Sequence, residues 1–250
     1  MMLLENKVAL ITGAGSERGI GLATARIFAE HGAKTALIDL DKDGLDRATG
    51  AAGNGARGYV CDVRDRDACR RVAGQVADDF GGLDILVNNA GVVYGTPVSD
   101  IEPDEYDRVL DVNLRGNFNM AQSVLPAMRK RGGGNIVCVS SIAGRAGGGV
   151  FGSSHYAAAK SGIFGLAKGL ARELAPQGIR VNAVAPGPID NDFTQGKMTD
   201  KDKARIAAGI PMGRLGTPGE VAKVILFLAS DLSSYVTGVV LDVNGGLLIH

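Results

Sequence analysis

The sequence contains no tryptophan and has only three histidines and three cysteines among its 250 residues. The cysteines, Cys61, Cys69 and Cys138, show no regular spacing. A structural zinc site or a disulfide framework would need cysteines or histidines in a paired pattern. We therefore expect no metal site, and we expect reduced thiols of the kind that persist in the cytoplasm.

An excess of charge of either sign is also missing. Lys and Arg together number 27, Asp and Glu number 27, and the net charge is zero. No overall field would attract nucleic acid or an anionic membrane. The opening "MMLLENKVALITG" is interrupted by Glu5 and Lys7, too early for a signal peptide or a membrane span. We expect a cytoplasmic protein that binds neither nucleic acid nor membrane.

The sequence does contain short apolar runs that alternate with longer amphipathic segments. The runs are "KVALIT", "KTALID", "RGYVCDV", "LDILVNN", "NIVCVSS", "IRVNAVAP" and "GVVLDV". Almost continuously apolar strands separated by helices are typical of a parallel sheet covered on both faces. We predict an α/β fold: one Rossmann-type, doubly wound domain over residues 1–250, with a seven-stranded parallel sheet and helices on both faces.

The longest predicted helices cover residues 103–131, 154–175 and 219–230. The segment 187–219 has no clear period, and we predict an irregular binding loop there.

The stretch "ITGAGSERGIG", Ile11 to Gly21, follows the first predicted strand and precedes a helix. Glycines in this place let backbone N–H groups approach a pyrophosphate at the helix N-terminus. Asp39 ends the next strand, about twenty positions after Gly19, where a carboxylate accepts hydrogen bonds from an adenosine ribose. Together the two features predict a dinucleotide site.

Further motifs follow in order along the chain: "NNAG" at Asn88–Gly91, "DVNLRG", "VSSIAG", "YAAAK", "PGPI" and "VTGVVLDVNGG". With the glycine loop, they make the sequence resemble the short-chain dehydrogenase/reductases from Lys7 to Gly246. The resemblance implies an NAD(P)-dependent enzyme that interconverts an alcohol and a ketone. The catalytic residues that it implies are Asn113, Ser141, Tyr156 and Lys160.

The pair Tyr156 and Lys160 shares one face of a predicted helix, because the two residues are four positions apart. A free tyrosine has a pKa of about 10 and is a poor base at neutral pH. A lysine ammonium and an oxidised nicotinamide nearby both favour the phenolate. By resemblance, Ser141 binds the substrate oxygen, Lys160 also binds the nicotinamide ribose, and Asn113 kinks the long helix and holds a water in a proton relay.

The resemblance also implies the cofactor contacts. Asn88 to Gly91 are expected beside the riboses, Asp62 beside the adenine, and Ile189 at the carboxamide. The full set is Gly13, Ser16, Arg18, Gly19, Ile20, Asp39, Asp62, Val63, Asn89, Ala90, Gly91, Tyr156, Lys160, Pro186, Ile189 and Asn191. Asn191 stands where the family often has threonine.

The glycine loop is longer than is usual in the family, most simply by Glu17 and Arg18. In relatives that use NADP, a basic residue just before the second glycine often pairs with the 2'-phosphate, and Arg18 has that place. Asp39 opposes a phosphate by like-charge repulsion. We therefore predict NAD rather than NADP, with Arg18 facing solvent or paired with an acid.

Three functions remain open. The first is an NAD-dependent dehydrogenase of a secondary alcohol, polyol or sugar. The second is a 3-oxoacyl-carrier reductase using NADPH, with Arg129 and Arg172 near the pocket rim. The third is a redox sensor without turnover, which retention of Ser141, Tyr156 and Lys160 disfavours.

The substrate wall is expected to be largely apolar. Its predicted members are Val92, Val93, Tyr94, Val150, Phe151, Phe193 and Met198. The helix 154–175 carries Ala and Gly where a free surface would carry long polar side chains, and the family pairs this helix between subunits. We expect a homotetramer acting on a small-molecule alcohol or ketone.

Overall fold

The computed structural model describes residues 2–53, 55–148, 152–193 and 199–249. Its seven strands form one parallel sheet in the order β3-β2-β1-β4-β5-β6-β7. This confirms the predicted sheet. The strands are β1 (Val8–Thr12), β2 (Lys34–Asp39), β3 (Arg57–Val60), β4 (Ile85–Asn88), β5 (Gly134–Val139), β6 (Ile179–Pro186) and β7 (Val240–Val243).

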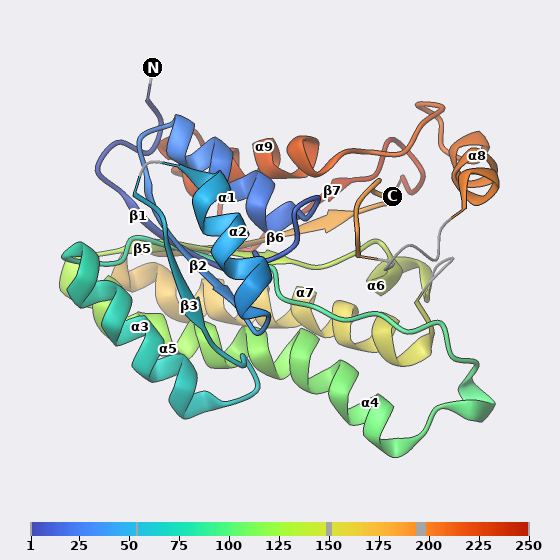
Figure 1. Cartoon of the computed structure of the whole chain (residues 1–250), viewed down its shortest axis with the longest axis horizontal. Helices are drawn as coiled ribbons and strands as arrows, with labels where there is room; N and C mark the ends of the chain where they lie inside the picture. The colour runs from blue at the N-terminus through green and yellow to red at the C-terminus, as the bar shows by residue number, and fades with distance from the viewer. Residues whose placement is uncertain (1, 54, 149–151, 194–198, 250) are drawn as a thin grey trace.

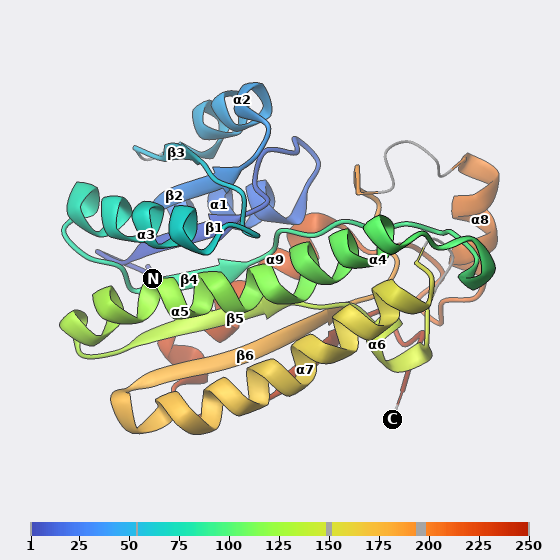
Figure 2. The same cartoon turned by 90° about the horizontal axis from the view of Figure 1, so that it is seen from below.

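Helices cover both faces of the sheet (Figure 1). One face carries α1, α2 and α9, and the other carries α3, α4, α5 and α7, as Figure 2 shows from below. Their bounds are α1 (Ile20–Glu30), α2 (Lys42–Ala52), α3 (Arg66–Phe80), α4 (Pro103–Leu110), α5 (Gly116–Arg131), α6 (Ala143–Ala146), α7 (Ser154–Leu174), α8 (Asp200–Ala208) and α9 (Pro218–Ala229).

The core lies in two layers because successive side chains of a strand point to opposite faces. Val8 and Leu10 of β1 pack in the layer beneath α3, α5 and α7. Ala9 and Ile11 of the same strand pack in the layer beneath α1, α2 and α9. All four are almost fully buried, which explains why the strand reads as a continuous apolar run.

The long helix predicted for residues 103–131 is present, but one wide turn interrupts it. A π-helical turn, Asp111–Arg115, joins α4 to α5, and the N–H of Gly116 bonds the carbonyl of Asp111. The turn contains Asn113, the residue expected to kink the helix.

The prediction that residues 187–219 form an irregular loop was wrong in part. Helix α8 lies within that segment and begins at a capping box: the hydroxyl of Thr199 accepts the N–H of Asp202, whose carboxylate accepts the N–H of Thr199. Such reciprocal bonds satisfy the donors of a first helical turn. The spacing of Thr199 and Asp202 was a signal for a helix start in the sequence. However, α8 buries only Ile206 and therefore shows little apolar periodicity.

None of the helices in the described parts of the chain has the length and apolar character needed to cross a membrane.

Candidate active site

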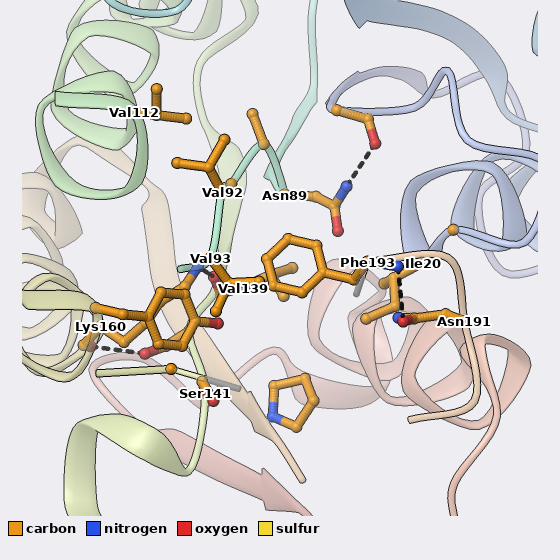
Figure 3. Close-up of a pocket in the computed structure, with 18 of the residues that line it drawn as sticks. Ile20, Asn89, Val92, Val93, Val112, Val139, Ser141, Lys160, Asn191 and Phe193 are labelled. Atoms are coloured by element: carbon orange, nitrogen blue, oxygen red, sulfur yellow. Dashed lines mark hydrogen bonds between the residues drawn. The ribbon is translucent and has the colours of Figure 1, made fainter. Parts of the chain in front are cut away.

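A cavity of about 1060 Å³ opens at the carboxyl ends of the strands. Ligands bind at this edge in doubly wound folds, because the loops that follow neighbouring strands meet there. The implied catalytic residues and the full set of cofactor contacts line the cavity, with the exception of Arg18 and Asn113. Figure 3 draws 18 of the lining residues and labels ten of them, among them Asn89, Ser141 and Lys160.

The glycine loop packs tightly against the start of the "NNAG" segment. Gly13 has a φ of +64°, and a Cβ there would lie 2.7 Å from Cα of Ala90. Asn89 donates its amide to the carbonyls of Thr12 and Gly13, both at 2.9 Å. The N–H groups of Asn89 and Ala90 both donate to the hydroxyl of Thr12. The loop after β1 is therefore clamped to the loop after β4, with Gly19 capping α1 at the cavity wall.

Asp39 is held rigidly at the end of β2. One carboxylate oxygen accepts the N–H of Gly15 at 2.8 Å, and the other accepts the N–H groups of Leu40 and Asp41 at 2.8 and 3.2 Å. A Cβ on Gly15 would lie 2.9 Å from the carboxyl carbon. The glycine thus allows the carboxylate to approach the loop.

Arg18 pairs with an acid, which is one of the two alternatives that the sequence left open for it. Its guanidinium lies 2.9 Å from Asp190, and its N–H donates to Asp192 at 3.2 Å. The hydroxyl of Ser16 donates to the same Asp192 carboxylate at 3.3 Å. Lys203 of α8 reaches Asp190 at 2.9 Å. The enlarged loop is therefore tied to the segment that follows β6.

Ser141, Tyr156 and Lys160 meet at the inner end of the cavity. Ser141 accepts the N–H of Ala143 at 3.1 Å, and its hydroxyl also hydrogen-bonds Tyr156. Lys160 donates to the carbonyl of Val139 at 3.1 Å, and its ammonium lies 5.6 Å from the ring centroid of Tyr156. Ser140 turns its hydroxyl to the carbonyl of Lys160 at 2.7 Å, which fixes α7 against β5.

Burial is the main influence on the pKa values of Tyr156 and Lys160. It raises the pKa of Tyr156 well above its usual value, although the hydrogen bond with Ser141 opposes the rise. Burial also lowers the pKa of Lys160 to about 8. Desolvation therefore disfavours the charged forms of both side chains. The expectation that Lys160 and an oxidised nicotinamide together favour the Tyr156 phenolate stays a prediction.

Asn113 lies behind the cavity rather than in its lining. Its amide donates to the carbonyls of Val92 and Val109, both at 2.9 Å. Its buried carbonyl oxygen has no hydrogen-bond partner among the described residues and would lie 2.8 Å from a Cβ on Gly91. The unpartnered oxygen therefore faces Gly91, with Lys160 next to the same position.

Two further asparagines, which the sequence motifs did not single out for this role, support the wide turn. Asn117 donates its amide to the carbonyl of Asn113 at 2.6 Å, and Asn88 donates to the carbonyl of Asn117 at 3.0 Å. Asn88 is therefore buried against α5 and does not line the cavity, contrary to the expectation that it lies beside a ribose.

The outer cavity wall contains Asp62 and Val63. Arg64 pairs with Asp62 at 2.6 Å, and this hydrogen-bonded pairing lowers the pKa of the Asp62 carboxyl. On the opposite side, Ile189 forms an isolated β-bridge with Gly216, and Asn191 follows two residues later. The amide oxygen of Asn191 accepts the N–H of Phe193 at 3.1 Å.

The predicted apolar wall is described in part. Val92, Val93, Tyr94 and Phe193 line the cavity, and Figure 3 shows Phe193 projecting into it from the side of Asn191. Its ring centroid lies 6.4 Å from that of Tyr156. Val150, Phe151 and Met198 lie outside the described residues. The sequence analysis missed Ile206, Leu247 and Leu248, which also line the cavity.

The expectation that Arg129 and Arg172 lie near the pocket rim was wrong. Arg172 is in the last turn of α7 and Arg129 in that of α5, whereas Tyr156 is near the start of α7. At 1.5 Å per residue, Arg172 is roughly 24 Å along the helix from Tyr156. Arg129 instead donates to Gln177 at 2.7 Å.

Comparison with known proteins agrees with this geometry. A family described as Enoyl-(Acyl carrier protein) reductase matches residues 13–248. An uncharacterized short-chain type dehydrogenase/reductase of Sinorhizobium fredii is 49% identical over 253 residues and covers 100% of both chains. The chain belongs to the short-chain dehydrogenase/reductase family. It is therefore an oxidoreductase of a family that uses NAD(P).

Two other short-chain dehydrogenase/reductases show how far the likeness extends. A 3-oxoacyl-(acyl-carrier-protein) reductase of Thermotoga maritima is 46% identical over 252 residues, with 99% of this chain and 100% of the relative covered. The crystal structure of a Sinorhizobium meliloti protein assigned as a short-chain alcohol dehydrogenase has a TM-score of 0.92 at 37% identity, covering 98% of each chain.

Proposed function

We propose that the protein is an NAD-dependent oxidoreductase that interconverts a secondary alcohol and its ketone, with Tyr156 as the acid and base. The observation that carries the proposal is the convergence of Ser141, Tyr156 and Lys160 on the cavity that the glycine loop also lines. A redox sensor without turnover would not need this arrangement of buried groups.

The cavity fits a dinucleotide. Ligand pockets are commonly about 300–1,000 Å³, and this cavity slightly exceeds that range. The N-terminus of helix α1 lies on one wall of the cavity, where a pyrophosphate would bind. The residues around it are Ser16, Gly19 and Ile20. Asp39 would accept the adenosine ribose hydroxyls, and Lys160 would bind the nicotinamide ribose.

The nicotinamide ring supplies the carbon that gives or takes a hydride, and the protein positions the substrate and handles the proton. In the reduction direction, Tyr156 donates its phenolic proton to the substrate oxygen, and its raised pKa keeps that proton in place until it is needed. Ser141 would donate its O–H to the same oxygen. Asn113 and Lys160 would carry the replacement proton, since the unpartnered oxygen of Asn113 faces Gly91 beside Lys160.

Cofactor choice follows from Asp39. Three N–H groups fix the carboxylate, so it cannot turn away from a 2'-phosphate, and Arg18 is occupied by Asp190. We expect NAD to be preferred over NADP by at least about tenfold in kcat/KM, or about 1.4 kcal/mol.

The test compares kcat/KM for both cofactors in the wild type, Asp39→Ala and Arg18→Ala. Asp39→Ala should erase most of the preference, while Arg18→Ala should leave it unchanged. A wild-type preference for NADP would overturn the assignment.

A second candidate is a 3-oxoacyl reductase that uses NADPH. The 46% identity to the Thermotoga maritima 3-oxoacyl-(acyl-carrier-protein) reductase favours it, whereas the fixed Asp39 and the remote Arg129 and Arg172 do not. A panel of secondary alcohols, polyols and 3-oxoacyl thioesters, read by the absorbance of the reduced nicotinamide, separates the two candidates. Fast reduction of the thioesters with NADPH alone would favour the second.

We also propose a homotetramer that works in the cytoplasm on a small-molecule alcohol or ketone, without a nucleic-acid or membrane partner. The small side chains of α7 and the balanced charge support this proposal.

A further inference from the structure

Two of the three cysteines lie together behind the outer wall of the cavity. Cys61 directly follows β3, and its N–H bonds the carbonyl of Asp39 at 3.1 Å. Cys69 lies in the first turns of α3, where its N–H bonds the carbonyl of Asp65. Asp65 caps that helix by accepting the N–H groups of Asp67 and Ala68. A short turn therefore brings the two cysteines close to each other.

The two sulfur atoms share a partner. Sγ of Cys61 lies 3.6 Å and Sγ of Cys69 lies 3.8 Å from the same carbonyl oxygen, that of Asp62. Cys69 Sγ also lies 3.4 Å from the carbonyl of Val63. The thiols contact each other, and the hydrogen bond from Cys69 lowers the pKa of Cys61, while the same bond raises the pKa of Cys69. Cys61 also lines the cavity, whereas Cys69 does not, so Cys61 is the thiol that an incoming oxidant meets first.

The pair also has a route to small molecules. Cys69 is fully buried and Cys61 is 4% exposed, but Cys61 belongs to the lining of the cavity together with Asp62 and Val63. A reagent as small as hydrogen peroxide can reach Cys61 through the cavity. Cys138 is equally buried and lies in the core beside Asn88 and Lys160, away from the other two thiols.

We propose that Cys61 and Cys69 form a reversible dithiol–disulfide pair that a peroxide oxidises and whose state is coupled to dinucleotide binding. The Cys61 thiolate attacks one peroxide oxygen, the O–O bond breaks, and hydroxide leaves, giving a sulfenic acid. The Cys69 sulfur then attacks Cys61, the S–O bond breaks, and water leaves with the Cys69 proton. In total, two thiols and one peroxide give a disulfide and two waters, and the peroxide takes the two electrons.

The bridge would alter the cavity wall. A disulfide holds its sulfurs about 2.05 Å apart, much closer than two sulfurs in a hydrogen-bonded contact, so its formation draws the end of β3 toward α3. Both contacts with the Asp62 carbonyl are then lost, and Asp62 and Val63 shift. The coupling rests on the proposed function, because it assumes that this wall receives the adenosine end of the cofactor. We expect the disulfide to weaken NAD binding at least about fivefold, and NAD to slow oxidation correspondingly.

The first test reads the bridge without using activity. The full chain is treated with hydrogen peroxide and its intact mass is measured, with peptide mapping. The expected result is the loss of two hydrogens, a bridge between Cys61 and Cys69, an unmodified Cys138, and reversal by dithiothreitol. In Cys69→Ser, we expect a sulfenic acid on Cys61 that dimedone traps. If the wild type gains oxygen without forming the bridge, the inference fails.

The second test measures NAD affinity by calorimetry for the reduced and the bridged protein, and the rate of oxidation with and without NAD. Weaker binding and slower oxidation support the coupling. A bridge that forms at an unchanged rate in saturating NAD would overturn the coupling. Failure of NAD to bind even the reduced protein would instead overturn the proposed function. Reduction of the bridge by dithiothreitol should restore the NAD affinity of the reduced protein.

Discussion

Lys160 is a cationic side chain in a place that disfavours charge. It is 2% exposed, and burial lowers its pKa to about 8, against about 10.4 in an unfolded chain. Between these values the unfolded chain binds a proton that the folded protein has released. The contribution of Lys160 to the free energy of unfolding therefore rises as pH increases from about 8 to about 10.

We predict that Lys160→Met removes this gain, which amounts to about 3 kcal/mol at most. The free energy of unfolding of both proteins is measured with urea at about pH 7.5 and about pH 9.5. The change between the two pH values is then compared for the wild type and the variant. Tyr156, Cys69 and Cys138 have raised pKa values and act in the opposite sense, but they do so in both proteins. If the free energy of unfolding changed equally with pH in the wild type and the variant, the prediction would be contradicted.

Tyr156 carries the proposed proton transfer. We predict that Tyr156→Phe lowers kcat at least about a hundredfold and leaves NAD binding nearly intact, because only the hydroxyl is lost. Steady-state kinetics and calorimetry check the two parts. Tyr235→Phe is the matched control, since Tyr235 is fully exposed and should keep full activity. Retention of more than half the activity in Tyr156→Phe would show that another group supplies the proton.

At the scale of elements, the wide turn between α4 and α5 depends on side-chain amides. Asn113 and Asn117 bond the carbonyls of Val109 and Asn113 across it. We predict that Asn117→Ala destabilises the protein by about 1–2 kcal/mol, through loss of a buried hydrogen bond, and also lowers activity by loosening Asn113. Ser123→Ala is the control, because it removes a similar bond at 2.7 Å in the regular part of α5. The control should lower stability but leave kcat unchanged.

Sequence patterns predict some elements well and others poorly, for physical reasons. The strands were predictable because both faces are buried, so every residue of β1 is apolar or a buried threonine. A kink at Asn113 was expected from the resemblance, but the width of the turn Asp111–Arg115 was not, because it depends on hydrogen bonds between segments distant in sequence. Helix α8 was missed because it packs only Ile206 into the protein.

The candidate site divides in the same way. Residues fixed by backbone position, such as Gly13, Ser141 and Tyr156, were placed by their motifs. Contacts between segments distant in sequence were not: the pairing of Arg18 with Asp190 depends on how two loops approach each other, and no local pattern specifies that. The ionisation of Tyr156 also depends on burial, which a motif does not show.

At the scale of the whole molecule, α7 exposes two glycines in its interior. Gly165 and Gly169 are one turn apart, and a Cβ on either would have open space around it. Each glycine costs about 1 kcal/mol relative to alanine in a helix, a cost that close approach of a second subunit would offset.

We predict that Gly169→Arg dissociates the proposed tetramer into smaller species, as measured by light scattering at micromolar concentration. Gly169→Ala is the control and should keep the assembly. In a protein that is monomeric from the start, both substitutions would only stabilise α7, and neither would change the mass.

The turn at Asp111–Arg115 also sets the rotational phase of one half of the long helix against the other. An α-helix advances about 100° per residue, so one residue more or fewer in the turn would rotate α4 by that angle relative to α5. Both halves could keep their own backbone bonds after a one-residue deletion, yet Val109, now fully buried, would swing toward solvent. The length of this turn is therefore fixed more strictly than its composition, and a single-residue deletion there should be harder to tolerate than most substitutions.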